Sequence, residues 1–273
     1  FLKFYISKLV LQSNFIMYSD MKNIFLILFL FVVQAGISQS MVVWVDYHDP
    51  VKGKGNELRE AVADKTKKYN QGAGTFQLYT WEVISGPRQG QLARAGVGPT
   101  WADFDNNSVT SEEFNYWMKN VDPMIASSSG REYFERVDDA SHDQSKPGEK
   151  VVGLNIHYVM APGSDRNHFW KFRSNLATAI KESGEDLSVN VWRSRGGGEQ
   201  GHVQVSFGFR NMEEYGNFYK VMSKVGDTYQ EMFGEDSWET DLDLLRGTIQ
   251  MWGARTELIR FLPELSSPPI ALQ

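Results

Sequence analysis

The sequence has no cysteine among its 273 residues. Disulfide bonds, thiolate metal sites, a cysteine nucleophile and a lipid-modified cysteine are therefore excluded. Basic residues are outnumbered as well, since 28 lysines and arginines stand against 34 aspartates and glutamates, and the net charge is -6. No run of basic residues offers a surface that could follow a phosphate backbone, so we expect no nucleic-acid partner.

The chain also lacks an apolar run long enough for a membrane-spanning helix, which takes about 20 residues. The run Ile24–Val33 is half that length, follows a charged start and is succeeded by small or polar residues as far as Ser40. This pattern is typical of a secretory signal peptide. We expect residues 1–20 to be an upstream extension of the reading frame and residues 21–40 to be a cleaved signal. The protein would then be periplasmic or extracellular and have no membrane contact after cleavage.

What the sequence does contain is an internal duplication. Residues 43–97 overlie residues 154–208 without a gap when they are moved forward by 111 positions. Tyr47 then meets Tyr158, Trp81 meets Trp192, and Gly86 meets Gly197. A second block aligns at an offset of 101 and places Glu112-Glu113-Phe114 over Glu213-Glu214-Tyr215. The expected units are a first repeat over 41–137, a linker over 138–150, a second repeat over 151–263 and a tail over 264–273.

Periodicity predicts the same order of elements in both copies. In the second copy, 153–160, 187–194 and 202–209 alternate as strands do, and apolar residues between 169 and 180 recur at helical spacing. Asn211 and Glu214 form a helix-capping pattern, as do Thr110 and Glu113 in the first copy. Final strands are expected over 131–137 and 255–262. The order β-α-β-β-α-β is that of a ferredoxin-like unit.

Two such units in tandem resemble the dimeric α+β barrel superfamily, which includes antibiotic-biosynthesis-type monooxygenases and haem-degrading enzymes. The resemblance rests on the order of elements, the duplication and the Glu-Glu-aromatic helix start, and it covers roughly residues 41–263. It implies an α+β protein in which two tandem ferredoxin-like repeats form a pseudo-dimeric α+β barrel. It also implies that the two sheets face each other around a cavity, with the helices outside.

Strand alternation places polar and aromatic residues on the sheet face opposite the helices. We expect these residues to line a small-molecule cavity between the two sheets. His157 and Asp46 are the candidate catalytic pair, because a carboxylate can orient an imidazole that moves protons. The candidate ligand-binding residues are Asn155, Trp192, Tyr79, Trp81, Asn190 and Gln204. Trp81 and Trp192 have an alternative role as packing residues at a pseudo-symmetric sheet contact.

We expect no metal and no cofactor. The five histidines do not show metal-ligand spacing, and haem ligation by the isolated His157 is disfavoured for the same reason. Three functions remain open. The first is binding of a small-molecule ligand in the cavity, the second is a cofactor-independent monooxygenase-like activity, and the third is a non-catalytic structural or partner-binding duplication. The sequence leaves the ligand and the oligomeric state open.

Overall fold

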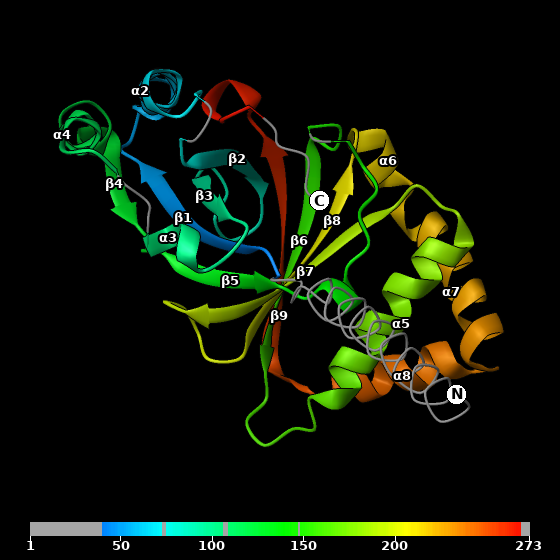
Figure 1. Ribbon diagram of the computed structural model, residues 1–273. Coiled ribbons are helices and arrows are strands. Elements are labelled where there is room, and N and C mark those ends of the chain that lie inside the picture. The colour runs from blue at the N-terminus through cyan, green and yellow to red at the C-terminus, as the bar shows by residue number, and fades with distance from the viewer. Residues whose placement is uncertain (1–39, 73–74, 106–108, 147, 269–273) are drawn as a thin grey trace, which may run out of the picture. The chain divides into compact units, whose positions relative to one another are not determined.

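Two copies of the β-α-β-β-α-β unit follow one another in the chain, as the duplication predicts (Figure 1). The computed structural model describes residues 40–72, 75–105, 109–146 and 148–268, and from Ser40 onward the chain forms one compact unit. The expected upstream extension and nearly all of the expected signal peptide lie outside these residues. Within the described ranges, no helix is long and apolar enough to cross a bilayer.

The elements of the first repeat are β1 (Val42–Pro50), α2 (Gly55–Tyr69), β2 (Gln77–Ser85), β3 (Leu92–Gly98), α3 (Ala102–Asp105), α4 (Ser111–Asn120), η1 (Asp122–Met124), β4 (Ile125–Ser128) and β5 (Glu132–Arg136). Those that follow are η2 (Asp138–Ala140), β6 (Val152–Met160), α5 (Asn167–Ser183), β7 (Ser188–Gly196), β8 (His202–Phe209), α6 (Met212–Gly216), α7 (Phe218–Phe233), α8 (Ser237–Arg246), β9 (Ile249–Phe261) and η3 (Pro263–Leu265).

The strands form one closed antiparallel barrel. Their order is β3-β2-β9-β6-β8-β7-β5-β1, and pairing of β1 with β3 closes the ring, while β4 pairs with the end of β1. The repeats are joined where β2 pairs with β9 and where β5 pairs with β7. Each repeat thus donates an outer strand to the other, and the predicted α+β barrel is confirmed.

Local sequence signals explain where several helices begin and end. Thr110 Oγ1 accepts a hydrogen bond from the Glu113 amide at 3.1 Å, and Asn211 Oδ1 accepts one from the Glu214 amide at 3.0 Å. Both caps satisfy a backbone donor that the helix itself leaves unpaired. Helix α5 ends at Gly184, whose φ of 68° lies in the left-handed region that glycine adopts without strain.

In the structure, the residues of β1 and β6 that occupy equivalent positions are one residue away from those that the sequence alignment pairs. Asp46 pairs with Arg94 on β3, and Ile156 pairs with Val205 on β8. The third strands therefore match at an offset of 111, whereas the first strands match at 110. Because side chains alternate between the two faces of a strand, this single residue moves every side chain of β1 to the other face.

The larger core lies in the second repeat, between its sheet and helices α5, α7 and α8. Phe169 and Phe172 from α5 meet Val205 and Phe207 from β8 there. The first repeat has a smaller cluster around Leu58 on α2. Burial of apolar surface contributes roughly 25 cal/mol per Å², so the second repeat supplies the greater part of the hydrophobic stabilisation.

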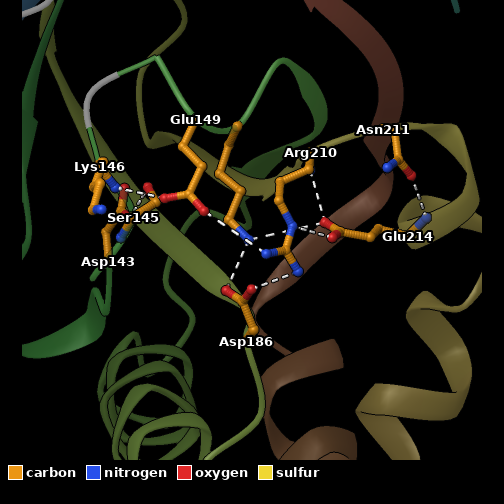
Figure 2. Close-up of polar contacts among 9 residues, drawn as sticks. Asp143, Ser145, Lys146, Glu149, Asp186, Arg210, Asn211 and Glu214 are labelled. Carbon is orange, nitrogen blue, oxygen red and sulfur yellow. Dashed lines mark hydrogen bonds and ion pairs between the residues drawn. The ribbon is translucent and has the colours of Figure 1, made fainter.

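The connecting and terminal segments are bound to the barrel. In residues 138–150, His142 bridges to Val189 on β7, and the Lys150 ammonium pairs with Asp186 at 2.8 Å. Figure 2 shows this region, where Arg210 also reaches Asp186 at 2.8 Å. The described part of the expected tail hydrogen-bonds to β2, since the Ser267 amide donates to the Leu78 carbonyl.

Candidate functional site

A chain of polar side chains crosses the inside of the barrel and links the two repeats. Arg88 binds both carboxylate oxygens of Glu257, at 2.7 and 2.6 Å, and its guanidinium lies 3.0 Å from His157 Nε2. His157 Nδ1 lies 3.0 Å from His202 Nε2, and His202 Nδ1 lies 2.7 Å from Glu132. Arg88 and Glu132 belong to the first repeat, and the other three belong to the second.

One assignment of protons satisfies all four imidazole nitrogens in this chain. Arg88 donates to His157 Nε2, His157 Nδ1–H donates to His202 Nε2, and His202 Nδ1–H donates to the Glu132 carboxylate. Both imidazoles are neutral in this arrangement. The chain therefore runs from the Glu257 carboxylate to the Glu132 carboxylate and links the two repeats inside the barrel.

The electrostatics agree with a neutral His157. Burial, together with the charge of Arg88, lowers the pKa of His157 to about 4, although Glu257 acts in the opposite sense. For Glu257, burial alone would raise the pKa, but the neighbouring His157 ring and the Arg88 guanidinium outweigh burial and lower the pKa to about 2. At neutral pH the ion pair is therefore that of Arg88 with Glu257, and His157 is an uncharged member of the chain.

The expected contact between His157 and Asp46 is not made. Asp46 lies on the helix-covered side of β1, where the hydroxyls of Ser128 and Ser129 donate to its carboxylate at 2.6 and 3.2 Å. The one-residue difference between the first strands is the physical reason. Tyr47, and not Asp46, occupies the position equivalent to His157, and the Arg88 guanidinium lies over its ring at 3.4 Å.

The expected ligand-binding residues are distributed along the barrel. Tyr79 and Trp81 pack with Phe261 at the β2–β9 junction, with the Trp81 and Phe261 ring centroids 5.6 Å apart. This arrangement matches the packing role considered for Trp81. Asn155 is buried, and its Oδ1 has no hydrogen-bond partner among the described residues.

Three further expected residues lie on β7 and β8. Asn190 accepts a hydrogen bond from Arg136 at 2.9 Å and donates one to Asp143 at 2.9 Å. Gln204 donates to Ser206 at 3.0 Å and stands opposite Trp192 in the strand register. Most polar groups of this face thus bind other side chains of the protein, and whether any of these residues binds a ligand stays a prediction.

Haem ligation by His157 does not fit this arrangement, because both ring nitrogens already have partners. Among the residues that the structure describes, no group of three or more histidines and carboxylates is placed to hold a metal ion. That the protein works without a cofactor stays a prediction.

A pocket of about 280 Å³ lies elsewhere, within the first repeat, between the sheet and helices α2 and α4. Its floor is formed by β1, β2 and β3, and β4 with the residues near it closes one side. The lining residues are Trp44, Asp46, His48, Lys65, Asn70, Phe76, Leu78, Arg94, Val109, Glu113, Phe114, Trp117, Met118, Asp122, Ile125, Ser128 and Arg131. Asp46 is the one residue of the predicted site that reaches this pocket.

Three charged residues of the pocket wall are buried. The Lys65 ammonium pairs with Glu113 Oε1 at 2.5 Å. The Arg94 guanidinium donates to Thr66 Oγ1 at 2.8 Å and to Thr80 Oγ1 at 3.1 Å, which are neutral oxygens. Among the buried residues of the wall, two cations stand against one anion, an excess of one positive charge. Of the other charged lining residues, Asp46 is half-buried and bound to Ser128 and Ser129, while Asp122 and Arg131 are exposed. Burial lowers the pKa of Arg94 only to about 10, so it is charged at neutral pH.

Aromatic rings and unpaired nitrogens complete the wall. Trp44 stacks on Phe76 with the ring centroids 6.4 Å apart, and His48 packs against Trp117 at 5.6 Å. Trp44 Nε1 and His48 Nδ1 are buried without a hydrogen-bond partner in the described part of the chain. Burial also lowers the pKa of His48, so this imidazole is neutral at pH 7. Unpaired buried polar atoms are uncommon, so they make this pocket the best candidate for a site.

The sequence held a signal for this pocket that the duplication argument did not use. At the offset of 111, Lys65 aligns with Leu176 and Arg94 aligns with Val205. Both apolar partners lie in the core of the second repeat. A charged residue aligned with a buried apolar one marks the place where the two copies are packed differently.

Comparison with known proteins gives a match in fold. The sequence matches no protein-family model and no curated protein. A protein described as a "putative monooxygenase" from Lactobacillus acidophilus superposes with a TM-score of 0.55 and 9% identity, over 86% of this chain and 100% of that one. An anthrone oxidase-like protein gives a TM-score of 0.50 and 8% identity, over 82% of this chain and 92% of that one.

A mutant chlorite dismutase from Candidatus Nitrospira defluvii gives a TM-score of 0.50 and 10% identity, over 84% of this chain and 94% of that one. At these identities the similarity concerns the fold and carries no residue-level correspondence. The chain therefore has the fold of the dimeric α+β barrel superfamily, with both halves of the barrel on one polypeptide.

Proposed function

We propose that the protein binds a small aromatic carboxylate in the pocket under α2 and α4. The observation that carries the proposal is the excess positive charge of the buried wall, where Arg94 donates its hydrogen bonds to neutral oxygens. A buried charge without a counterion is costly. A ligand carboxylate would supply that counterion through charge-assisted hydrogen bonds, which are the stronger kind.

The size and the walls of the pocket support a small, flat ligand. Its volume of about 280 Å³ lies just below the range for ligand pockets, about 300–1,000 Å³. Trp44, Trp117 and Phe76 provide aromatic surfaces for a ring. At the rim, Phe114 and Met118 are 56% and 45% exposed. Apolar side chains on one part of the rim and a charged interior fit a ligand that enters with its carboxylate first.

Calorimetric titration with two matched probes tests the proposal. Mandelate carries an aromatic ring and a carboxylate, and phenylethanediol has the same skeleton with a neutral hydroxymethyl group in place of the carboxylate. We expect mandelate to bind at one site per chain and at least about tenfold more tightly, since a hydrogen bond to a charged group contributes about 1.5–3 kcal/mol. Equal affinity for both probes, or no binding of mandelate, would overturn the proposal.

Two arginine variants locate the site. Arg94→Gln removes the charge of the pocket wall and should weaken mandelate binding at least about tenfold. Arg173→Gln is the matched control, because Arg173 is also a buried arginine, but it lies in α5 and bonds to Tyr158 in the second repeat. Mandelate affinity should be unchanged in this control. Thermal melting of both variants identifies any loss that comes from unfolding.

A second candidate function is a monooxygenase-like oxidation of an aromatic substrate in the same pocket. Its support is the fold shared with the monooxygenase-like and anthrone oxidase-like proteins, together with the aromatic walls. Oxygen uptake in the presence of anthrone is the measurement. Uptake that is lost in the Arg94→Gln variant would favour the enzyme, whereas mandelate binding without any uptake favours a binding protein.

We also propose that the protein is exported, on the strength of the signal-like pattern in residues 21–40. The measurement is mass analysis of the N-terminus of protein recovered from the periplasm or the medium. A first residue between Gln39 and Met41 is expected. Recovery of exported protein that retains residues 24–33 would contradict this part of the proposal.

A further inference from the structure

Lys65 is a buried amine on the wall of the pocket. It lies in α2, is 5% exposed, and its Nζ donates to Asn70 Oδ1 at 2.8 Å and to Glu113 Oε1 at 2.5 Å. An ammonium group has three donors, so these two bonds leave one position on the nitrogen for a molecule in the pocket. The two partners also hold the side chain in one orientation.

A larger fraction of the Lys65 amine is unprotonated at neutral pH than in an exposed lysine, because of the surroundings of its side chain. Burial lowers its pKa to about 8, the positive charges of Arg94 and Arg131 act in the same sense, and Glu113 opposes them. At pH 7 a pKa of about 8 leaves about 9% of the amine unprotonated, against about 0.03% at the ordinary value. Desolvation beside another cation is a known means of activating a lysine as a nucleophile.

The fold itself does not require a charged pair at this position. The aligned residue of the second repeat, Leu176, packs α5 against its sheet as part of an apolar core. Replacing a buried ion pair by apolar residues is often neutral or stabilising in proteins. The packing of α2 against α4 therefore does not by itself explain the Lys65–Glu113 ion pair, which suits a role in the pocket.

We propose that Lys65 forms a reversible imine with a carbonyl carbon of the pocket ligand, which makes the ligand a small aromatic oxo acid. This deepens the proposed function and rests on it, because the carboxylate of the same ligand faces Arg94. Glu113 is the proton carrier for the reaction. Lys65 is the catalytic residue in the sense that its nitrogen bonds to the ligand.

The step balances without an oxidant or a reductant. The lone pair of the neutral Nζ attacks the carbonyl carbon, a C–N bond forms, and the π electrons of the carbonyl move to its oxygen, which takes up a proton. The nitrogen gives one proton to the Glu113 carboxylate, and Glu113 passes that proton to the hydroxyl group. The C–O bond then breaks and water leaves as the nitrogen lone pair forms the C=N bond of an iminium ion. The iminium nitrogen gives its last proton to Glu113, which releases it to solvent in place of the proton that the oxygen took up. The products are the imine and one water molecule.

Reductive trapping with phenylglyoxylate tests the inference. Sodium cyanoborohydride delivers hydride to the imine carbon and converts the imine to a stable secondary amine, which peptide mass spectrometry locates. At pH 7 we expect Lys65 to be modified at least about tenfold faster than Lys68, which lies in the same helix with its side chain 52% exposed. Modification of Lys65 at the same rate as Lys68, or more slowly, would overturn the inference.

Variants and a matched ligand separate this inference from the proposed function. Lys65→Arg keeps the charge opposite Glu113 and should abolish the fast labelling. Lys65→Met serves the same purpose if the arginine variant does not fold. Mandelate, which has no carbonyl beside its carboxylate, is titrated in parallel. Mandelate binding without fast labelling of Lys65 refutes the imine and leaves the binding function intact, whereas failure of both refutes both.

Discussion

The two repeats share their strand order and their helix caps, but they differ in what lies under the helices. In the second repeat, Leu176 on α5 and Val205 on β8 belong to a continuous apolar core. In the first repeat the aligned positions are Lys65 and Arg94, and a pocket opens beside them. The comparison teaches that one repeat can carry most of the apolar packing, which leaves the other free to hold a polar site.

A lysine placed in the second repeat at the position aligned with Lys65 should give the largest effect on stability. Leu176→Lys puts the lysine of the first repeat into the core of the second, where Glu214, the counterpart of Glu113, is already bound to Arg210. The free energy of unfolding should fall by about 3–5 kcal/mol, because a buried charge would lack a partner. Urea unfolding measures this. Stability close to that of the wild type would mean that the two interiors are not distinct.

Acid should weaken the junction between the repeats. The pKa of His157 is lowered to about 4 in the folded protein, below its ordinary value of 6.5. The unfolded chain therefore takes up the proton first, so stability is complete above pH 6.5 and falls as the pH drops to about 4, by on the order of 3 kcal/mol. Glu257, with its pKa lowered to about 2, adds a further loss below its ordinary value of 4.5.

Urea unfolding at a series of pH values checks this expectation. The His157→Gln variant is the control, since it lacks the titrating ring, and its stability should vary less between pH 6.5 and 4. A wild-type profile that is flat over this range would show that His157 is not held neutral in the barrel.

The helix caps should be equivalent in the two repeats. Thr110→Ala and Asn211→Ala each remove a side-chain oxygen that accepts a hydrogen bond from a backbone amide, so each should cost about 1 kcal/mol. Thermal melting of both variants measures the effect. Costs that differ by more than about 1 kcal/mol would show that the two helices contribute unequally to the fold.

The smallest effect on stability is expected where the charged pair is removed completely. Lys65→Leu together with Glu113→Leu gives the first repeat an interior more like that of the second. The free energy of unfolding should not fall, because apolar replacement of a buried ion pair is often neutral or stabilising. Reductive labelling at this position should disappear in the double variant. A loss of several kcal/mol would instead assign the pair a purely structural role.

The fold was predictable from the sequence because repetition and periodicity act over many residues. An ungapped alignment over 43–97 fixes which strands are equivalent, and the capping residues fix where two helices begin. The barrel then follows from two units that each donate an outer strand to the other. Individual errors of alignment do not disturb such a pattern.

The site was less predictable because it depends on single residues. The identical residues Tyr47 and Tyr158 supported an offset of 111. The backbone instead places Tyr47 in the position equivalent to His157, so Asp46 was assigned to the wrong face. The partners of His157 come from the β2–β3 turn and from β8, and no local pattern connects Arg88 with Glu257 on β9. Pairings between segments distant in the sequence depend on the closed barrel.

The location of a bound carboxylate tests the central claim most directly, and a crystal structure of the protein with mandelate provides it. We predict density for one mandelate per chain between α2, α4 and the sheet of the first repeat, with its carboxylate at Arg94 and its ring against Trp117. Density inside the barrel beside His157, or in the second repeat under α5, would contradict the account.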